Sequence, residues 1–175
     1  MKIVDIFAPH LFAFHYKNEK ENELSRLLNL WNNPIWLTEF ILQHKADIGN
    51  IDYDDLIENL IDDANEIDDI INEGATKGGM SLDDFFKTLD NLEYKQIPLS
   101  RRKGRKNYLR LYALKIENNC YVITGGGIKF EKVHKMQDRP HLNQELIKFE
   151  KCKAFLKENG VSDYDSFYEF LNEKL

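Results

Sequence analysis

The sequence predicts a single α+β domain in which an antiparallel sheet is covered by amphipathic helices. Two observations predict this class. Apolar residues recur at helical spacing up to Asn91, then alternate with period two, and return to helical spacing near the C-terminus. The alternating part contains short runs joined by tight turn signals, which is typical of an antiparallel meander. A length of 175 residues suits one core, so we expect one domain over 1–175.

The N-terminal part is predicted to be a β-hairpin followed by a helix pair. Residues 2–7 and 11–16 are apolar runs separated by a Pro-containing turn, the pattern of a hairpin. Residues 19–31 then carry leucines and a tryptophan at helical spacing. Asn33 and Pro34 are a cap and a first-turn proline, so they predict a second helix directly after the first.

An acidic helix is predicted over residues 51–73, inside an inserted segment over 47–78. Its apolar residues fall on one face, and acidic residues fill the rest. No lysine or arginine occurs between Ala46 and Ala75. One interpretation is an ordinary solvated face. The other is a mimic of nucleic acid, which restrains a basic surface of the same chain or docks a basic partner.

The second half is predicted to form the sheet and its C-terminal cover. Ser81 and Asp84 form a capping box that opens a short helix. Strands are expected at residues 94–99, 107–116 and 120–124, with residues 128–130 continuing the pairing after three glycines.

Two helices are predicted to close the domain. One covers residues 141–158 and ends near Gly160. Ser162 or Asp163 caps the other.

Composition predicts a cytoplasmic protein without membrane segments. The two cysteines, Cys120 and Cys152, show no metal or disulfide spacing, so we expect reduced thiols. An early Asp5 is inconsistent with a signal peptide, and no apolar run is long enough to cross a bilayer. No histidine pattern predicts a metal, and we expect no cofactor. The net charge of −6 argues against a generic nucleic-acid binder, but the charge is unevenly distributed.

Basic residues concentrate in one stretch that contains no acid between Gln96 and Lys115. Cations of this density can hold a nucleic-acid backbone, and neighbouring aromatic rings can stack on bases. The alternative is a solvated, disordered loop with the tyrosines in the core. The predicted nucleic-acid-binding residues here are Arg101, Arg102, Lys103, Arg105, Lys106, Tyr108 and Tyr112.

A second basic group follows the predicted meander, and we expect Lys129 to project from the sheet near Arg110. Cleavage of a phosphodiester by the 2′-hydroxyl needs a base, an acid and a cation, and His134 and His141 have suitable pKa values. The alternatives are a capping role for His141 and a surface role for His134. Lys132 and Arg139 are further candidates for nucleic-acid binding.

The glycines Gly125, Gly126 and Gly127 lack the pattern of a phosphate-binding loop. They indicate a bulge, or a bare backbone that a ligand or another chain can approach.

Three segments together resemble the C-terminal half of RelE/HigB-like toxins. They are the strand over 108–114, the strand over 121–130 with its terminal lysine, and the helix start over 141–146. The resemblance covers roughly residues 1–45 and 80–158. It implies a fold like that of microbial ribonucleases, with Arg110 and Lys129 at the scissile phosphate and His141 at the start of the last shared helix.

The resemblance also implies a function and partners. These are metal-independent, ribosome-dependent cleavage of mRNA and a cognate antitoxin, often of helix-turn-helix type. The alternative is a non-catalytic binding or regulatory protein on the same scaffold, whose acidic helix engages a basic protein. A third hypothesis is an unrelated role on a generic antiparallel sheet.

Overall fold

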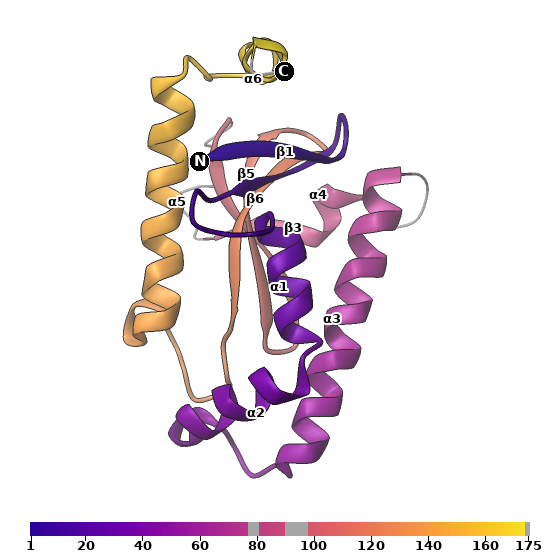
Figure 1. Cartoon of the computed structure of the whole chain (residues 1–175), viewed down its shortest axis with the longest axis vertical. Helices are drawn as coiled ribbons and strands as arrows, with labels where there is room; N and C mark the ends of the chain where they lie inside the picture. Colours follow the sequence, from indigo (N-terminus) through magenta and orange to yellow (C-terminus); the bar gives the residue numbers. More distant parts are fainter. Residues whose placement is uncertain (77–80, 90–97, 174–175) are drawn as a thin grey trace.

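The computed structural model describes residues 1–76, 81–89 and 98–173 and confirms an α+β architecture. Within these ranges, a six-stranded sheet has the order β1-β2-β6-β5-β4-β3, with helices on both sides (Figure 1). The strands are β1 (Lys2–Phe7), β2 (Leu11–His15), β3 (Phe86–Thr88), β4 (Ser100–Lys106), β5 (Leu109–Glu117) and β6 (Cys120–Ile128). The α-helices are α1 (Glu23–Trp31), α2 (Pro34–Gln43), α3 (Tyr53–Thr76), α4 (Leu82–Phe85), α5 (Pro140–Glu158) and α6 (Tyr164–Glu173). Short 3₁₀ turns are η1 (Lys45–Asp47) and η3 (Met136–Asp138).

The sheet is mixed rather than purely antiparallel. The predicted meander is present, because β4 pairs with β5 and β5 pairs with β6 in antiparallel register. The hairpin of β1 and β2 is also present. However, β2 joins the sheet parallel to β6, with Leu11 opposite Tyr121 and Ala13 opposite Ile123. Two parallel strands need a long connection between them, and here the chain between β2 and β6, with helices α1 to α4 and strands β3 to β5, provides it.

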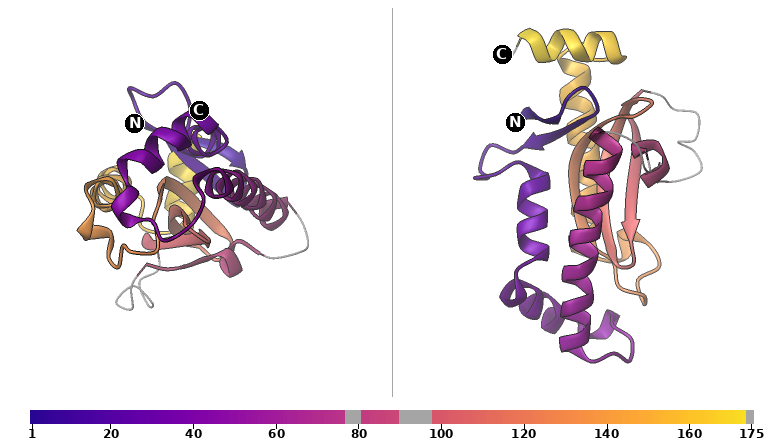
Figure 2. Two further views of the ribbon diagram at one scale, coloured as in Figure 1. Left: turned by 90° about the horizontal axis from the view of Figure 1, so that it is seen from below. Right: turned by 90° about the vertical axis from the view of Figure 1, so that its right-hand side faces the viewer.

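Each face of the sheet has its own core. Leu109, Leu111 and Ala113 of β5 pack with α1, α2 and α3 on one face. Tyr112, Leu114 and Ile116 pack with α5 and α6 on the other. The two sets alternate along the strand, as the pleat requires. In the right-hand view of Figure 2, α3 runs in front of the sheet and α5 runs behind it.

The helix caps follow the predicted chemistry. Asn33 accepts hydrogen bonds from the backbone N–H groups of Ile35 and Trp36, at 3.0 and 3.3 Å. Gly160 has a φ of +81° just after α5, a conformation that glycine adopts without strain. Asp163 caps α6 by accepting from Ser166 N at 2.9 Å. No helix in the described part of the chain is both long and apolar enough to cross a bilayer.

Several predicted boundaries were wrong. The basic stretch at 100–106 is the regular strand β4, not a loop, because it pairs along its whole length with β5. The strand expected at 94–99 lies largely outside the described residues. Residues 86–88, expected in a helix, instead pair with β4 as β3. Helix α3 continues past Gly74 to Thr76. Strand β6 includes its glycines, and the bulge predicted there agrees with a shift of register in its pairing with β5, where Tyr112 is opposite Gly125 but Ala113 is opposite Ile123.

The glycines in β6 are required by close packing on both faces of the strand. A Cβ on Gly126 would lie 2.6 Å from the backbone oxygen of Arg110 and 2.9 Å from Leu27 of α1. A Cβ on Gly125 would lie 2.1 Å from a carboxylate oxygen of Glu145 in α5. The bare backbone predicted from the sequence is therefore approached by helices of the same chain.

Candidate nucleic-acid interface

Four cationic side chains lie on one face of the sheet. Arg105 of β4 is directly opposite Arg110 of β5, and Lys103 is opposite Tyr112 on the same face. Arg110 is also opposite Gly127, two residues before Lys129, so the pleat places Lys129 on this face as well. The backbone N–H of Lys129 donates to Tyr108 O at 2.8 Å and extends the ladder. We call Lys103, Arg105, Arg110 and Lys129 the cationic cluster.

The cationic cluster has no acidic counterpart. Among the described residues, none of its four members forms an ion pair with a carboxylate. Arg110 is only 7% exposed, and its guanidinium donates to the backbone oxygens of Asn107 and Leu109, at 2.5 and 3.1 Å. Lys129 donates to His134 O at 3.0 Å, and Arg105 donates to Asn107 O at 3.3 Å. Carbonyl oxygens satisfy the donors, and the charge of Asp138 offsets only part of the repulsion at Lys129.

The mutual repulsion of these groups is visible in their pKa values. Burial first, and then the charge of Arg105, lowers the pKa of Arg110 to about 10. Burial, followed by the charges of Arg110 and Arg105, lowers the pKa of Lys103. Burial and the charges of Arg110, Lys103 and Arg105 also lower the pKa of Lys129. A bound polyanion would relieve this repulsion, so the arrangement favours binding of phosphate groups.

Two basic residues of β4 lie on the opposite face and are not part of the cationic cluster. Arg102 is buried, and its Nε donates to the Ser100 hydroxyl at 3.1 Å. Lys106 forms a 2.6 Å ion pair with Glu66 of α3. Arg101 shares the face of the cationic cluster and lies 3.7 Å from the Glu150 carboxylate of α5. Side chains alternate between the two faces along a strand, so basic residues that are adjacent in the sequence lie on opposite faces of the sheet. A count of local charge treats them as one group.

The residues of the second basic group also lie in different environments. Arg139 forms an ion pair with buried Asp47, with its Nε 2.9 Å from each carboxylate oxygen, so its guanidinium is engaged within the chain. Lys132 has an exposed side chain, and its backbone N–H donates to Asp47 O. His134 is exposed, and its carbonyl oxygen is the one that accepts from Lys129.

His141 is not placed for the predicted catalytic role. One ring nitrogen lies 3.1 Å from Ile128 O. The ring packs edge-on against Phe40 and His44 of the α2 region, with centroids 5.4 and 4.6 Å apart. Burial lowers its pKa. His141 therefore joins α5 to the α2 side of the molecule and does not point into the cationic cluster.

The predicted stacking tyrosines are also engaged elsewhere. Tyr112 lies on the correct face but is buried under Phe149 of α5, with ring centroids 5.5 Å apart. Tyr108 lies on the other face, where its hydroxyl donates to Glu131 at 3.2 Å and its ring contacts Phe130. Neither ring offers a free face beside the cationic cluster.

The acidic helix α3 docks on the face away from the cationic cluster. Glu66 pairs with Lys106, and the Asp63 carboxylate accepts from the Asn107 amide at 2.9 and 3.0 Å. The interpretation that this helix restrains the basic surface therefore applies to Lys106 alone. Besides Glu66, the exposed acids of α3 are Asp54, Asp55, Glu58, Asp62, Asp69 and Glu73.

A buried polar network between α1 and α5 was not predicted. Lys148 Nζ lies 3.2 Å from Glu145 and 3.4 Å from Glu23, and Arg26 donates to Glu23 at 2.6 Å. Burial raises the pKa of Glu145 to about 7, and one of its oxygens has no hydrogen-bond partner in the structure. The network extends past the edge of β6, in the part of β6 that does not pair with β2. There the Tyr16 hydroxyl donates to Thr124 O at 2.5 Å. The glycine triplet was the sequence signal of this close approach.

No protein-family model, curated protein or solved structure matches the chain. Among the described residues, no group of three or more His, Cys, Asp or Glu side chains could hold a metal ion. The cationic cluster is therefore interpreted from its own geometry and charge.

Proposed function

We propose that the chain binds RNA at the cationic cluster and cleaves mRNA as a metal-independent endoribonuclease of the RelE/HigB-like kind. The observation that carries the proposal is the convergence of four cations from β4, β5 and the end of β6, without a carboxylate partner. Clustering of like charge costs stability, and it is retained in proteins mainly where an anion offsets it. The surface is small and one-sided, which fits a single phosphate backbone.

The cluster also contains groups for the chemistry of 2′-hydroxyl attack. Arg110 and Lys129 would neutralise the scissile phosphate and the charge of the phosphorane. Because His141 is engaged with Ile128 and Phe40, we assign proton transfer to exposed His134, whose carbonyl oxygen accepts from Lys129, and to Lys103 within the cluster.

The test is cleavage of mRNA by purified chain with ribosomes, together with growth after induced expression. The double variant Arg110→Ala, Lys129→Ala should lose RNA binding, cleavage and growth arrest. The matched control is Lys106→Ala, Lys132→Ala, which removes two cations outside the cluster and should retain all three. A toxic and cleaving Arg110/Lys129 double variant would refute the proposal. If the parent chain binds RNA without cleaving it, the proposed RNA interface is supported and the proposed endoribonuclease activity is refuted.

A second proposal is a non-catalytic role in which α3 binds a basic protein. It is favoured by the six exposed acids of α3 other than Glu66, on a helix that carries no lysine or arginine. The helix-turn-helix antitoxin implied by the resemblance would be such a partner if it has a basic surface. The variant Asp62→Asn, Asp69→Asn should weaken this complex, and unchanged affinity counts against it. Asp63 is left intact because it bonds Asn107 and supports the fold.

A further inference from the structure

The first strand leaves a long edge of the sheet open. Strand β1 is at the end of the strand order, and within the described residues it pairs with β2 alone. The ladder with β2 is regular from Lys2 to Asp5 and becomes irregular before Phe7. Alternate residues of this stretch therefore direct their N–H and C=O groups outward, where a further strand could bond them. At the other edge, β3 has only three residues.

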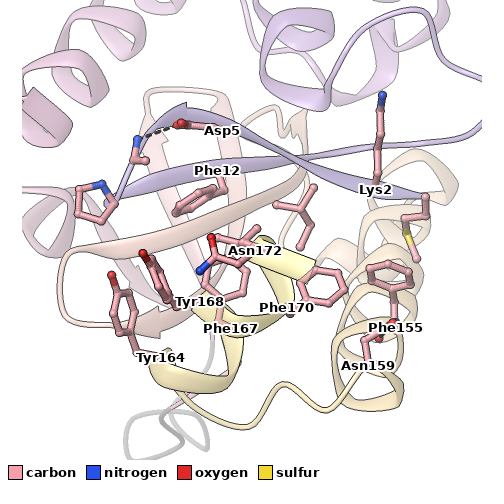
Figure 3. Close-up of a pocket in the computed structure, with 15 residues that line it drawn as sticks. Lys2, Asp5, Phe12, Phe155, Asn159, Tyr164, Phe167, Tyr168, Phe170 and Asn172 are labelled. Atoms are coloured by element: carbon pink, nitrogen blue, oxygen red, sulfur yellow. Dashed lines mark hydrogen bonds between the residues drawn. The ribbon is translucent and has the colours of Figure 1, made fainter. Parts of the chain in front are cut away.

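An apolar cavity of about 480 Å³ lies beside this open edge. It is enclosed by β1, by Phe12 of β2 and by α6, and it is lined mainly by aromatic and aliphatic side chains. Figure 3 shows the rings of Phe12, Phe167 and Phe170 gathered between β1 and the C-terminal helix. Ile3 and Asp5, which share one face of β1, also line the cavity. The open backbone and the apolar cavity are thus presented side by side.

We propose that β1 and this cavity form a docking site for an extended segment of a partner protein, which adds a strand to the sheet. Only a peptide backbone can pair with the open edge of β1, so a simple apolar molecule could fill the cavity but not bond to the edge. The cavity requires a large apolar side chain. Asp5, whose carboxylate accepts from Ala8 N at the rim, favours a lysine or arginine as its cross-strand neighbour. Side chains on one face recur every second residue, so the expected motif is an apolar residue two positions from a basic one.

A second copy of the chain fits this site less well than a basic partner segment. In a two-fold antiparallel pairing, directly opposite residues come from the same face of the strand. Asp5 of one copy could therefore be directly opposite Ile3 or Asp5 of the other, but not Lys2, which alternates with Asp5 along the strand although it also lines the cavity. Self-pairing would leave Asp5 without a directly opposite cation. The docking site does not depend on RNA binding, because it lies at the α6 end of the sheet.

The test is selection of a random peptide display library on the folded full chain. We expect enriched peptides with an apolar residue two positions from a lysine or arginine. A synthetic peptide of the enriched sequence should protect the β1 amides from hydrogen exchange. Methylation of its outward backbone nitrogens should weaken its binding at least tenfold, because a strand must donate hydrogen bonds to the edge.

Variants of the chain distinguish the contribution of the apolar cavity to binding from that of the Asp5 carboxylate. Tyr168 lines the cavity and is 56% exposed, so Tyr168→Asp should weaken binding at least tenfold without unfolding the chain. Ile35→Asp, at an exposed apolar position on α2, is the matched control and should bind as the parent does. Asp5→Asn keeps an acceptor for Ala8 N and should weaken binding about threefold.

Three outcomes would overturn the proposal. They are failure to enrich any peptide, binding that is insensitive to backbone methylation, and protection of β1 by self-association of the chain. Because the methylated peptide leaves the protein unchanged, the test does not depend on whether a variant folds. RNA affinity measured on the same variants distinguishes failure of this site from failure of the cationic cluster.

Discussion

Arg105 and Arg110 are directly opposite each other in the antiparallel register of β4 and β5, without a carboxylate between them. Like charges at such a position destabilise a sheet. We therefore expect Arg105→Gln to raise the free energy of unfolding by about 0.5 kcal/mol while weakening RNA binding. Urea unfolding at low and high salt measures the first effect, which should shrink as salt screens the pair. A variant that is less stable than the parent at low salt would contradict it.

RNA affinity should depend on salt with a slope that reflects the four cations. Release of counterions predicts a slope of log affinity against log salt near −3, from about −0.7 per phosphate contact on a single strand. Lys129→Gln should reduce the steepness by about 0.7, because it removes one contact. Lys106→Gln should leave the slope unchanged, since Lys106 is paired with Glu66 on the other face. Titration of a labelled oligoribonucleotide at several salt concentrations measures these slopes.

Glu145 should make stability fall as pH rises through neutrality. Burial raises its pKa from 4.5 to about 7, so the folded chain holds a proton there that the unfolded chain has released. Between these two values the folded state is favoured less as pH increases, and above pH 7 the loss is complete. Glu145→Gln removes the effect, so its stability relative to the parent should be higher at pH 8 than at pH 5 by about 2 kcal/mol.

The matched control for this pH effect is Glu158→Gln, at an exposed position near the end of α5. It should show no such difference between the two pH values. Urea unfolding at pH 5 and pH 8 provides the measurement. An equal effect of Glu145→Gln at both values would mean that Glu145 is already ionised throughout this range.

Gly126 should not tolerate a side chain. Its Cβ would lie 2.6 Å from the Arg110 carbonyl oxygen, a backbone atom that cannot move without shifting β5. We expect Gly126→Ala to cost about 3 kcal/mol of stability. Gly127→Ala would meet only a methyl group of Leu142, at 3.1 Å, and should cost about 1 kcal/mol. Thermal unfolding of the two variants gives the comparison, and equal costs would show that the strand adapts as a unit.

Arg139 should matter for stability and not for RNA. Its pair with Asp47 holds the pKa of that buried carboxyl below its usual value. Arg139→Ala leaves the carboxylate uncompensated and should destabilise the fold by about 2 kcal/mol at neutral pH. The cost should diminish as acid protonates Asp47 in the variant. RNA affinity at neutral pH should equal that of the parent at temperatures where both are folded.

Local signals predicted the elements of the fold better than their assembly. The Asn33 cap, the strand alternation over residues 107–116 and the helix stop at Gly160 depend on nearby residues, and all were predicted. The parallel pairing of β2 with β6 depends on residues more than a hundred positions apart, and no local pattern encodes it. The face on which α3 docks is set by distant partners such as Asn107.

The sequence predicted that Arg110 and Lys129 lie near each other, but it did not predict which neighbouring candidates the chain itself engages. Arg110 and Lys129 share a face because the meander register and the pleat follow from turn positions that the sequence marks. His141 and Arg139 were misplaced because their partners, Phe40 and Asp47, lie about a hundred residues away in the chain. Lys103 as a proton-transfer group depends on a pKa that only the packed structure defines.

The placement of α3 behind the sheet, away from the cationic cluster, gives the molecule opposite electrical poles. A protein with cations on every side can cross-link polyanions into aggregates. Here a second RNA strand that approached the face of the sheet covered by α3 would meet the acids of α3 and be repelled. Binding of RNA would therefore be monovalent, and mixtures of the two should stay clear and of uniform size as their ratio changes.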